Sequence, residues 1–347
     1  MEKRAYYDRL DIVKGLAMFL VVLGHCIQCG SGAAFNEQQL FFDDGLFRFI
    51  YSFHMPLFMI ISGFLYGKTS TNKPLLSMIK GRTLRLLLPV VVWQTGLTAI
   101  ALVRGGGFDF LSYCKSIIEG FWFLWAAWWA TIICTIVDRI TKSKTIRVGI
   151  HAGIILITLF TPDELNFSLH KFMYVSFLTG LFAARSNWDE KKLSGNRKIS
   201  FLIVMAAVFA GLFLLFRKES FIYISGWTLL GKENWLTILG WDIYRITIGI
   251  VGATIIIYLV YLLIPAEKEK LLKDAGKNTS GIYILQTFAN TAMLKFLAGI
   301  QHRMLINIGE AIVVFIACYI IVKLISKIPY ASCILFGQKT KAVKTNG

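Results

Sequence analysis

The sequence predicts an all-α, polytopic membrane protein with about ten transmembrane helices and both termini in the cytoplasm. Three observations support this fold class. Of the 347 residues, 56% are hydrophobic and the mean hydropathy is +0.62, whereas a soluble domain is typically about 45–50% apolar. Apolar runs of about 20 residues, long enough to cross a bilayer, recur along the chain. Basic residues gather in alternate loops, as the positive-inside rule requires.

The apolar runs define ten expected spans, of which the fifth and sixth are the shortest. No internal repeat or low-complexity tract divides them, so we expect a single transmembrane domain over residues 1–347. The first span lacks the features of a cleaved leader and is expected to be retained. The spans cover residues 11–29, 47–66, 84–103, 120–137, 146–161, 171–184, 199–216, 240–264, 279–298 and 306–325.

The charges of the segments between the spans alternate along the chain. The first loop is acidic, with Glu37, Asp43 and Asp44, and the other odd-numbered loops carry few basic residues. This alternation predicts that both termini and the even-numbered loops face the cytoplasm. It also explains the net charge of +17 without nucleic acid as a partner. The basic residues of the termini and even-numbered loops are Lys3, Arg4, Arg9, Lys68, Lys73, Lys80, Arg82, Arg85, Arg139, Lys142, Lys144, Arg147, Arg185, Lys191, Lys192, Arg197, Lys198, Lys268, Lys270, Lys273, Lys277, Lys327, Lys339, Lys341 and Lys344.

The first span carries two ionisable residues, Lys14 and His25, within an apolar run. Such residues are costly in hydrocarbon and each needs a partner or a function. Their separation of eleven residues puts both on one helix face at about 100° per residue, and roughly 16 Å apart at about 1.5 Å per residue. One face of this helix is therefore expected to join the cytoplasmic side to a point past the middle of the membrane.

The second span contains His54 about seven residues from its outer end, followed closely by Pro56. A proline frees the carbonyl about four residues back and can kink the helix there. His25 lies about four residues from the outer end of its own span, so the two histidines are expected at a similar depth. His54 is either a site residue or a packed histidine that donates to a backbone carbonyl.

The third span opens with Arg82 and Arg85, which share one helix face because they are three residues apart. Arginine is suited to bidentate contacts with phosphate. The same two residues could instead extend toward lipid head groups at the cytoplasmic edge. Spacing alone leaves both interpretations open.

Several aromatic and polar residues lie toward the outer side. Tryptophans at the start of the fourth span form either an interfacial belt or the wall of a sugar site, and Trp122 is the expected contact. The loop at 217–239, the longest outer connection, is a candidate cover for that site.

Four further polar residues fall in late spans. Asp242 and Arg245 are three residues apart and either pair with each other or contact a substrate. Gln286 and Glu310 lie within the last two spans, where buried polar groups either join helices or bind substrate.

The cysteines show no framework of disulfides. Cys26 and Cys29 form a C-x-x-C pattern, but within an apolar helix and without a second pair. We interpret them as packing residues, and because no metal-ligand spacing occurs elsewhere, no metal is expected.

Several of these segments resemble one protein family. Residues 9–25 read RLDIVKGLAMFLVVLGH, which is similar to the opening of the acyltransferase-3 family of integral membrane acyltransferases. Its members modify bacterial surface glycans and include fucose O-acetylase-like proteins. The family pattern of a basic residue, ten residues and a histidine fits Lys14 and His25. The resemblance continues in FHMPLF at 53–58 with SGF at 62–64, RTLR at 82–85, WFL at 122–124 and GKNTSGIY at 276–283.

Two positions depart from the family pattern. Lys14 stands where many members have arginine, and Gln286 stands where some relatives have histidine. Some members also carry a C-terminal hydrolase-like domain. Without one, transfer is expected to be completed within the membrane domain.

The resemblance implies an acetyl-CoA-dependent O-acetyltransferase in a bacterial cell membrane, with membrane lipid around it. It would move an acyl group, most simply acetyl, from cytoplasmic acyl-CoA to a hydroxyl of a surface glycan or lipid-linked sugar. Arg82, Arg85 and Lys14 would bind the donor phosphates. His25 would act as general base or carry the acyl group covalently, with His54 assisting. The expected acceptor contacts are Trp122, Asp242, Arg245, Gln286 and Glu310.

The sequence leaves open three alternatives to an O-acetyltransferase. A glycan or lipid exporter or flippase would also suit basic residues at one mouth and aromatic residues at the other, although no inverted repeat points to it. A membrane sensor domain is a second alternative. Within the enzyme class, another acyl group such as succinyl would require a basic residue near His25, and Arg48 or Arg245 could serve.

Overall fold

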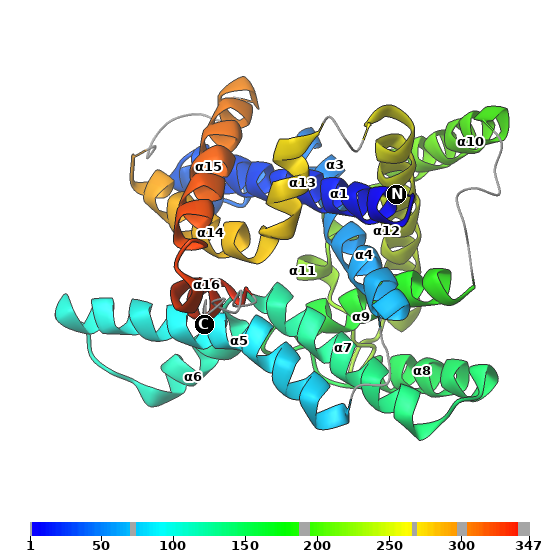
Figure 1. Cartoon of the computed structure of the whole chain (residues 1–347), viewed down its shortest axis with the longest axis horizontal. Coiled ribbons are helices and arrows are strands. Elements are labelled where there is room, and N and C mark those ends of the chain that lie inside the picture. Colours follow the sequence, from blue (N-terminus) through cyan, green and yellow to red (C-terminus); the bar gives the residue numbers. More distant parts are fainter. Residues whose placement is uncertain (1, 70–73, 187–194, 266–268, 297–303, 339–347) are drawn as a thin grey trace, which may run out of the picture.

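The computed structural model describes residues 2–69, 74–186, 195–265, 269–296 and 304–338, and every regular element in these ranges is a helix (Figure 1). The all-α prediction is therefore confirmed. In chain order the helices are α1 (Glu2–His25), the π-helix η1 (Cys26–Gly30), α2 (Ala33–Glu37), the 3₁₀-helix η2 (Leu40–Asp43), α3 (Gly45–Tyr51), α4 (His54–Thr69), α5 (Leu75–Val103), α6 (Phe110–Glu119), α7 (Trp122–Ile140), α8 (Lys144–Thr158), α9 (Phe167–Arg185), α10 (Gly195–Leu214), the 3₁₀-helix η4 (Lys218–Ser220), α11 (Ile222–Ser225), α12 (Trp235–Leu263), α13 (Lys270–Lys277), α14 (Thr279–Phe296), α15 (Met304–Ile325) and α16 (Pro329–Phe336).

Seven segments among the described residues are long and apolar enough to cross a membrane, so the chain is a multi-pass membrane protein. The remaining predicted spans correspond to α8, α9 and α14, which are helical but do not belong to these seven. The count of ten therefore stays a prediction. The seven segments are Tyr7–Gly30, Gly45–Thr69, Leu75–Val103, Trp122–Ile140, Arg197–Leu214, Trp235–Leu263 and Met304–Ile325.

Some sequence predictions fall outside the described residues. These are the end of the expected span 279–298 and the loop or terminal residues Lys73, Lys191, Lys192, Lys268, Lys339, Lys341 and Lys344.

The first predicted span is an unbroken α-helix as far as His25 and then continues as η1. The shared face of Lys14 and His25 is therefore preserved. Helix α1 can approach α13 closely because Gly276 of α13, which has no side chain, packs on α1. A Cβ atom at Gly276 would lie 1.8 Å from the carbonyl oxygen of Asp11. Helices α1 and α13 are thus in backbone contact.

The second predicted span, 47–66, is not one helix. It is broken into α3 and α4, which meet at Ser52 and Phe53. Pro56 has no N–H group to donate to the carbonyl of Ser52, so the α-helical hydrogen-bond ladder cannot continue there. His54 then donates from Nδ1 to the carbonyl of Ile50 at 2.8 Å. The break fixes His54 at the first position of α4.

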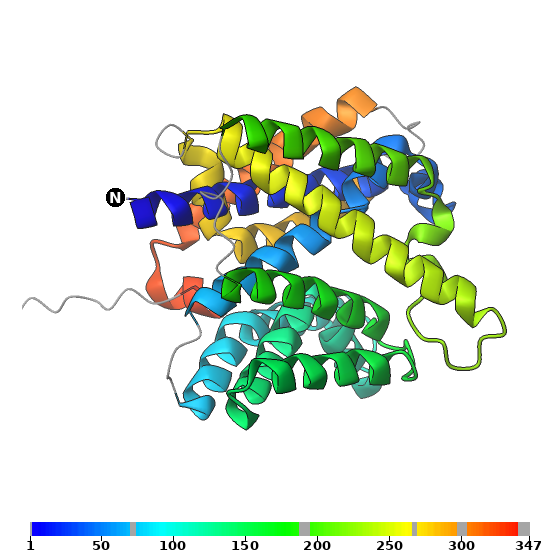
Figure 2. The same ribbon diagram turned by 90° about the vertical axis from the view of Figure 1, so that its right-hand side faces the viewer.

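The two ends of the helical bundle carry different segments of the chain. In Figure 2 the start of α1 and the short helix α16 lie toward the same end of the bundle, and the connection between α10 and α12 lies at the other end. Which end faces the cytoplasm stays a prediction.

Candidate active site

The C-terminal end of α1 meets α14. His25, the last residue of α1, is half-buried, and its Nδ1 lies 2.9 Å from Oε1 of Gln286 on α14. The π-helix η1 begins directly after His25, and such irregular turns are frequent at functional sites. Two residues that the sequence separates by 261 positions are thus joined by a hydrogen bond.

The surrounding hydrogen bonds define which nitrogen of His25 carries the proton. Asn290 Nδ2 donates to Gln286 Oε1 at 2.6 Å, and Gln286 Nε2 donates to the carbonyl of Tyr283 at 3.2 Å. The oxygen of Gln286 therefore faces His25 as an acceptor, so Nδ1 of the neutral ring is the donor. The lone pair of His25 then lies on Nε2, the nitrogen that this network leaves available as a base.

His54 lies near this site on the other side of Tyr51. The rings of Tyr51 and His54 are 4.5 Å apart, and a Cβ atom at Gly24 would lie 2.7 Å from the Tyr51 ring. His25 and His54 are close enough to interact electrostatically. The hydrogen bond from His54 to the carbonyl of Ile50 fits a packed histidine. The proximity of His54 to His25 fits a site residue.

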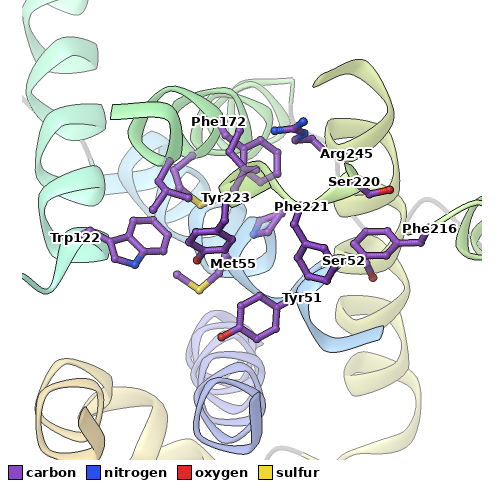
Figure 3. A pocket seen from close by; sticks show the side chains of 14 residues that line it. Tyr51, Ser52, Met55, Trp122, Phe172, Phe216, Ser220, Phe221, Tyr223 and Arg245 are labelled. Atoms are coloured by element: carbon purple, nitrogen blue, oxygen red, sulfur yellow. The ribbon is translucent and has the colours of Figure 1, made fainter. Parts of the chain in front are cut away.

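A narrow pocket with a cavity volume of about 30 Å³ lies beside Tyr51. Figure 3 shows Trp122, Met55 and Tyr223 around its centre, with Tyr51 on one side and Arg245 on the opposite side. The predicted contacts Trp122 and Arg245 therefore line one pocket. The rest of the lining is mostly apolar and consists of Ser52, Pro56, Leu169, Phe172, Met173, Phe216, Ser220, Phe221 and Ile222.

The predicted covering loop contributes part of this wall. The segment that contains η4 and α11 supplies Ser220, Phe221, Ile222 and Tyr223 to the pocket. Trp227 from the same loop is buried outside the pocket and donates to Thr158 Oγ1 at 3.2 Å. The loop is therefore a fixed wall at the segment 220–223.

Asp242 and Arg245 pair with each other, as one of the two sequence interpretations expected. Arg245 Nη1 lies 3.5 Å from Asp242 Oδ1, and both side chains are buried. Arg245 also donates to the carbonyl of Gly226 at 2.8 Å and to Ser225 Oγ. Its charge is thus used to hold the loop before α12. Asp242 does not line the pocket.

Gln286 and Glu310 contact the end of α1 and do not line the pocket. Gln286 holds His25, as described above. Glu310 Oε2 lies against Gly30 of η1, where an added Cβ atom would be 2.3 Å away. Within the described part of the chain this buried oxygen has no hydrogen-bond partner. Both residues therefore surround the turn that follows His25.

Lys14 lies about three turns before His25 and is paired on its own helix. Its Nζ is 2.7 Å from Asp11 Oδ1, three residues earlier. Any role of Lys14 in binding a donor would need this pair to open or to act as a unit.

Arg82 and Arg85 lie near a cluster of charged groups on neighbouring helices. The Arg82 guanidinium is within electrostatic reach of Arg85 and of Tyr66. Tyr66 donates to Asp138 Oδ2 at 3.0 Å, and the same carboxylate is bound by Arg185 at 2.5 Å. Arg147 lies 3.5 Å from its other oxygen. Asp138 on α7 is thus bound by Tyr66 of α4, Arg147 of α8 and Arg185 of α9. Arg82 of α5 lies within electrostatic reach of Tyr66 at the edge of this cluster.

The cysteines are free thiols. Cys26 is buried, and its Sγ lies 3.8 Å from Asn290 Oδ1. Cys29 accepts a contact from Asn36 Nδ2 at 3.7 Å. These contacts agree with the packing interpretation. Among the described side chains, no group of three or more His, Cys, Asp and Glu is arranged to hold a metal ion.

The chain also matches a known protein family. The model of the acyltransferase domain matches residues 7–327, nearly the whole chain. The chain belongs to the acyltransferase-3 family. The residues around His25, which resembled this family in the sequence, are thus part of an acyltransferase domain.

Two curated relatives of this acyltransferase are each called nodulation protein NolL. The one from Mesorhizobium japonicum is 28% identical over 220 residues, which is 61% of this chain and 57% of the relative. The one from Sinorhizobium fredii is 34% identical over 121 residues, 33% of this chain and 32% of the relative. The matches thus span about a half and about a third of these relatives. No solved structure matches the chain.

Sequence reasoning missed two phenols of the candidate site. Tyr51 and Tyr223 both line the pocket, and they are near enough to each other and to Tyr283 for their charges to interact. The three tyrosines, Tyr51, Tyr223 and Tyr283, come from α3, α11 and α14, respectively. Tyrosine is common in membrane helices and at membrane interfaces, so nothing in their sequence positions distinguishes them. Only the fold brings them together.

Proposed function

We propose that the chain transfers an acyl group, most simply acetyl, from cytoplasmic acyl-CoA to a hydroxyl of a glycan or lipid-linked sugar outside a bacterial cell membrane. The observation that carries this proposal is the bond between His25 and Gln286. It leaves Nε2 of His25 available as a base. His25 does not line the aromatic pocket, but the preceding residue, Gly24, packs on Tyr51, which does. Membership of the acyltransferase-3 family supports the reaction class.

The proposed reaction balances without a further reagent. Nε2 of His25 takes the proton of the acceptor hydroxyl while its oxygen attacks the thioester carbonyl carbon. The C–S bond breaks, and the departing CoA thiolate takes the proton back from the imidazolium. The products are an ester and free CoA, and His25 returns to its neutral form. Transfer through an acyl-histidine gives the same products in two steps.

The donor end is proposed at Arg82 and Arg85. The positive charges of Arg82 and Arg85 support this assignment, because the two side chains lie within electrostatic reach of each other. The resulting excess of positive charge favours a ligand with several phosphates. A pantetheine arm running along α1 would need to cover a distance similar to the roughly 16 Å between Lys14 and His25.

The acceptor is proposed to bind in the pocket beside Tyr51. Trp122 offers an aromatic face for a sugar ring, and Tyr51 and Tyr223 offer hydroxyls. Arg245 is already bonded to Asp242, Gly226 and Ser225, which favours an uncharged acyl group such as acetyl over succinyl. Arg48 remains as a cation for the succinyl alternative.

The test is acetyl-CoA turnover by purified protein in nanodiscs with a glycan mixture. His25→Ala should release free CoA about 10²–10⁴-fold more slowly, the usual contribution of a general base. Arg85→Ala should raise the KM for acetyl-CoA about tenfold, because one charge-assisted contact is lost. The matched control is Arg104→Ala, just beyond the other end of α5, which should change neither constant.

Two results would reject the proposal. One is that wild type neither binds nor consumes acetyl-CoA better than an unrelated membrane protein, in which case an exporter or flippase becomes the leading account. The other is that His25→Ala turns over acetyl-CoA at the wild-type rate.

A further inference from the structure

A second cavity lies on the other side of α9 from the aromatic pocket. It has a cavity volume of about 530 Å³ and lies between α7, α8, α9 and the connection from α8 to α9. This volume falls within the range of small-molecule sites, roughly 300–1,000 Å³. The lining is predominantly apolar and includes Trp129, Ala130, Ile133, Ile154, Phe167 and Tyr174.

His170 gives this cavity a polar end. The side chain is only 7% exposed, and it lines the cavity. Within the described residues, neither of its ring nitrogens has a hydrogen-bond partner. Phe167 packs on the ring at 5.5 Å and supplies no hydrogen bond. Because a buried polar group without a partner costs free energy, a ligand that forms a hydrogen bond with one of these nitrogens would be favoured here.

The charged side chains around His170 indicate which charge the head group of that ligand can have. Lys171 is fully occupied, because its Nζ donates to the carbonyls of Thr161 and Pro162 and to Asp163 at 2.7–2.9 Å. Glu164, which is exposed, adds a negative charge at the rim. An anionic head group is therefore not favoured. A neutral imidazole offers one donor and one acceptor, which match a hydroxylated head group.

The surroundings of the cavity define the rest of the ligand. Helix α7 is one of the seven segments that are long and apolar enough to cross a membrane, and its Trp129, which lines the cavity, is 39% exposed. On the neighbouring helix α8, Leu156 and Ile157 are 59% and 66% exposed. We expect such exposed apolar side chains to face hydrocarbon in a bilayer. We propose that this cavity holds one hydrocarbon chain of a neutral, hydroxyl-bearing lipid, with its hydroxyl bonded to His170. This proposal does not depend on the proposed transfer reaction.

The test is photolabelling in nanodiscs with a long-chain alcohol that carries a diazirine near its tail. Labels mapped by mass spectrometry should fall on the α7 and α8 segments around Ile133 and Ile154. Unlabelled long-chain alcohol should compete for them, and an otherwise identical hydrocarbon probe without the hydroxyl should label them less.

Three variants of cavity residues and one control variant sharpen the experiment. Ile154→Trp should fill the cavity and remove the labels, with Ile133→Trp as the alternative from α7. His170→Phe keeps a ring but no nitrogen, and should weaken competition by the alcohol about fivefold, the effect of one ordinary hydrogen bond. Val204→Trp, on an α10 surface that is 59% exposed at this residue, should leave the labels unchanged.

Three outcomes overturn the proposal. The first is equal labelling by the alcohol and the hydrocarbon in wild type. The second is labelling that unlabelled alcohol does not reduce. The third is cavity labelling that persists in folded Ile154→Trp and Ile133→Trp. Acetyl-CoA turnover is a separate readout, so failure here and failure of the proposed reaction are distinguishable.

Discussion

At the scale of single residues, the side-chain amide of Gln286 holds His25 at the end of α1. Gln286 accepts from His25 Nδ1 and is itself oriented by Asn290 and by the carbonyl of Tyr283. The sequence had placed Gln286 among the acceptor contacts. Because it contacts His25 and does not line the pocket, we expect Gln286 to be a positioning residue that acts on the proposed reaction through the histidine.

Replacing Gln286 by Leu should therefore lower kcat while leaving the KM for acetyl-CoA nearly unchanged. The physical reason is that Nδ1 loses its acceptor, and a ring in the wrong tautomer or orientation is a poor base. We expect a loss of about tenfold or more, below the about 10²–10⁴-fold effect of losing a general base. Steady-state turnover of acetyl-CoA measures both constants.

Gln286→Glu is the matched control, because it keeps an acceptor oxygen of the same reach. It should recover more activity than Gln286→Leu. If Leu and Glu variants are equally impaired at equal stability, the positioning role of Gln286 is wrong.

At the scale of elements, the site depends on how closely helices approach. Helices α4 and α9 are in backbone contact through two glycines. A Cβ atom at Gly63 would lie 1.9 Å from the carbonyl oxygen of Phe177, and one at Gly180 would lie 1.8 Å from that of Ile60. Small residues allow such contacts between membrane helices. This contact positions His54, at the start of α4, relative to the pocket residues at the start of α9.

Gly180→Ala should destabilise the protein, because the added methyl group meets rigid backbone. Overpacking of this kind costs about 1–3 kcal/mol. The control is Gly149→Ala on α8, where an added Cβ atom meets nothing within 4 Å, and where alanine should be neutral or stabilise the helix by up to about 1 kcal/mol. Thermal unfolding in detergent compares the two. Equal midpoints would show that α4 and α9 can separate at little cost.

Helix boundaries show what patterns could not predict at this scale. Pro56 predicted a kink about four residues back within the apolar run over 47–66, and α3 and α4 do meet there, at Ser52 and Phe53. The sequence did not show that the run is divided into two separate helices. Helix α16 was not predicted. It connects α5 and α14 through two hydrogen bonds. Trp93 Nε1 of α5 donates to the carbonyl of Leu335 at 2.9 Å, and Ser280 of α14 donates to the carbonyl of Phe336 at 2.9 Å.

At the scale of the whole molecule, one carboxylate fastens the loop before α12 to the loop between α8 and α9. Asp163 accepts from the backbone N–H groups of Trp227 and Thr228 at 2.7 and 3.0 Å and from Lys171 at 2.9 Å. Burial by itself would raise the pKa of Asp163, but these three donors outweigh it and lower the pKa below its usual value. The fastened loop then supplies the pocket wall at 220–223.

The lowered pKa gives this contact a defined pH dependence. The folded pKa lies below the unfolded value of about 3.9, so the stabilisation is fully present above about pH 4 and is lost as the pH falls through the folded pKa. Asp163→Asn should lower the free energy of unfolding at pH 7 by about 1.5–3 kcal/mol, the contribution of hydrogen bonds to a charged group. Thermal midpoints measured from pH 7 to pH 3 should show the gap between wild type and variant closing below pH 4. A gap that stays constant over this range would contradict the assignment.

The sequence by itself determined the helical class, the face shared by Lys14 and His25, and the residues that resemble the acyltransferase-3 family. These features are local, because hydrophobic length and helical spacing act over one or two dozen neighbouring residues. The tertiary structure decided which distant residues meet. It joined Gln286 to His25, Arg245 to Asp242 and the loop before α12, and Tyr51 to Tyr223. Such contacts depend on glycine-mediated backbone approach and on the break at Pro56, and no periodicity in the sequence encodes the angle at which two helices cross.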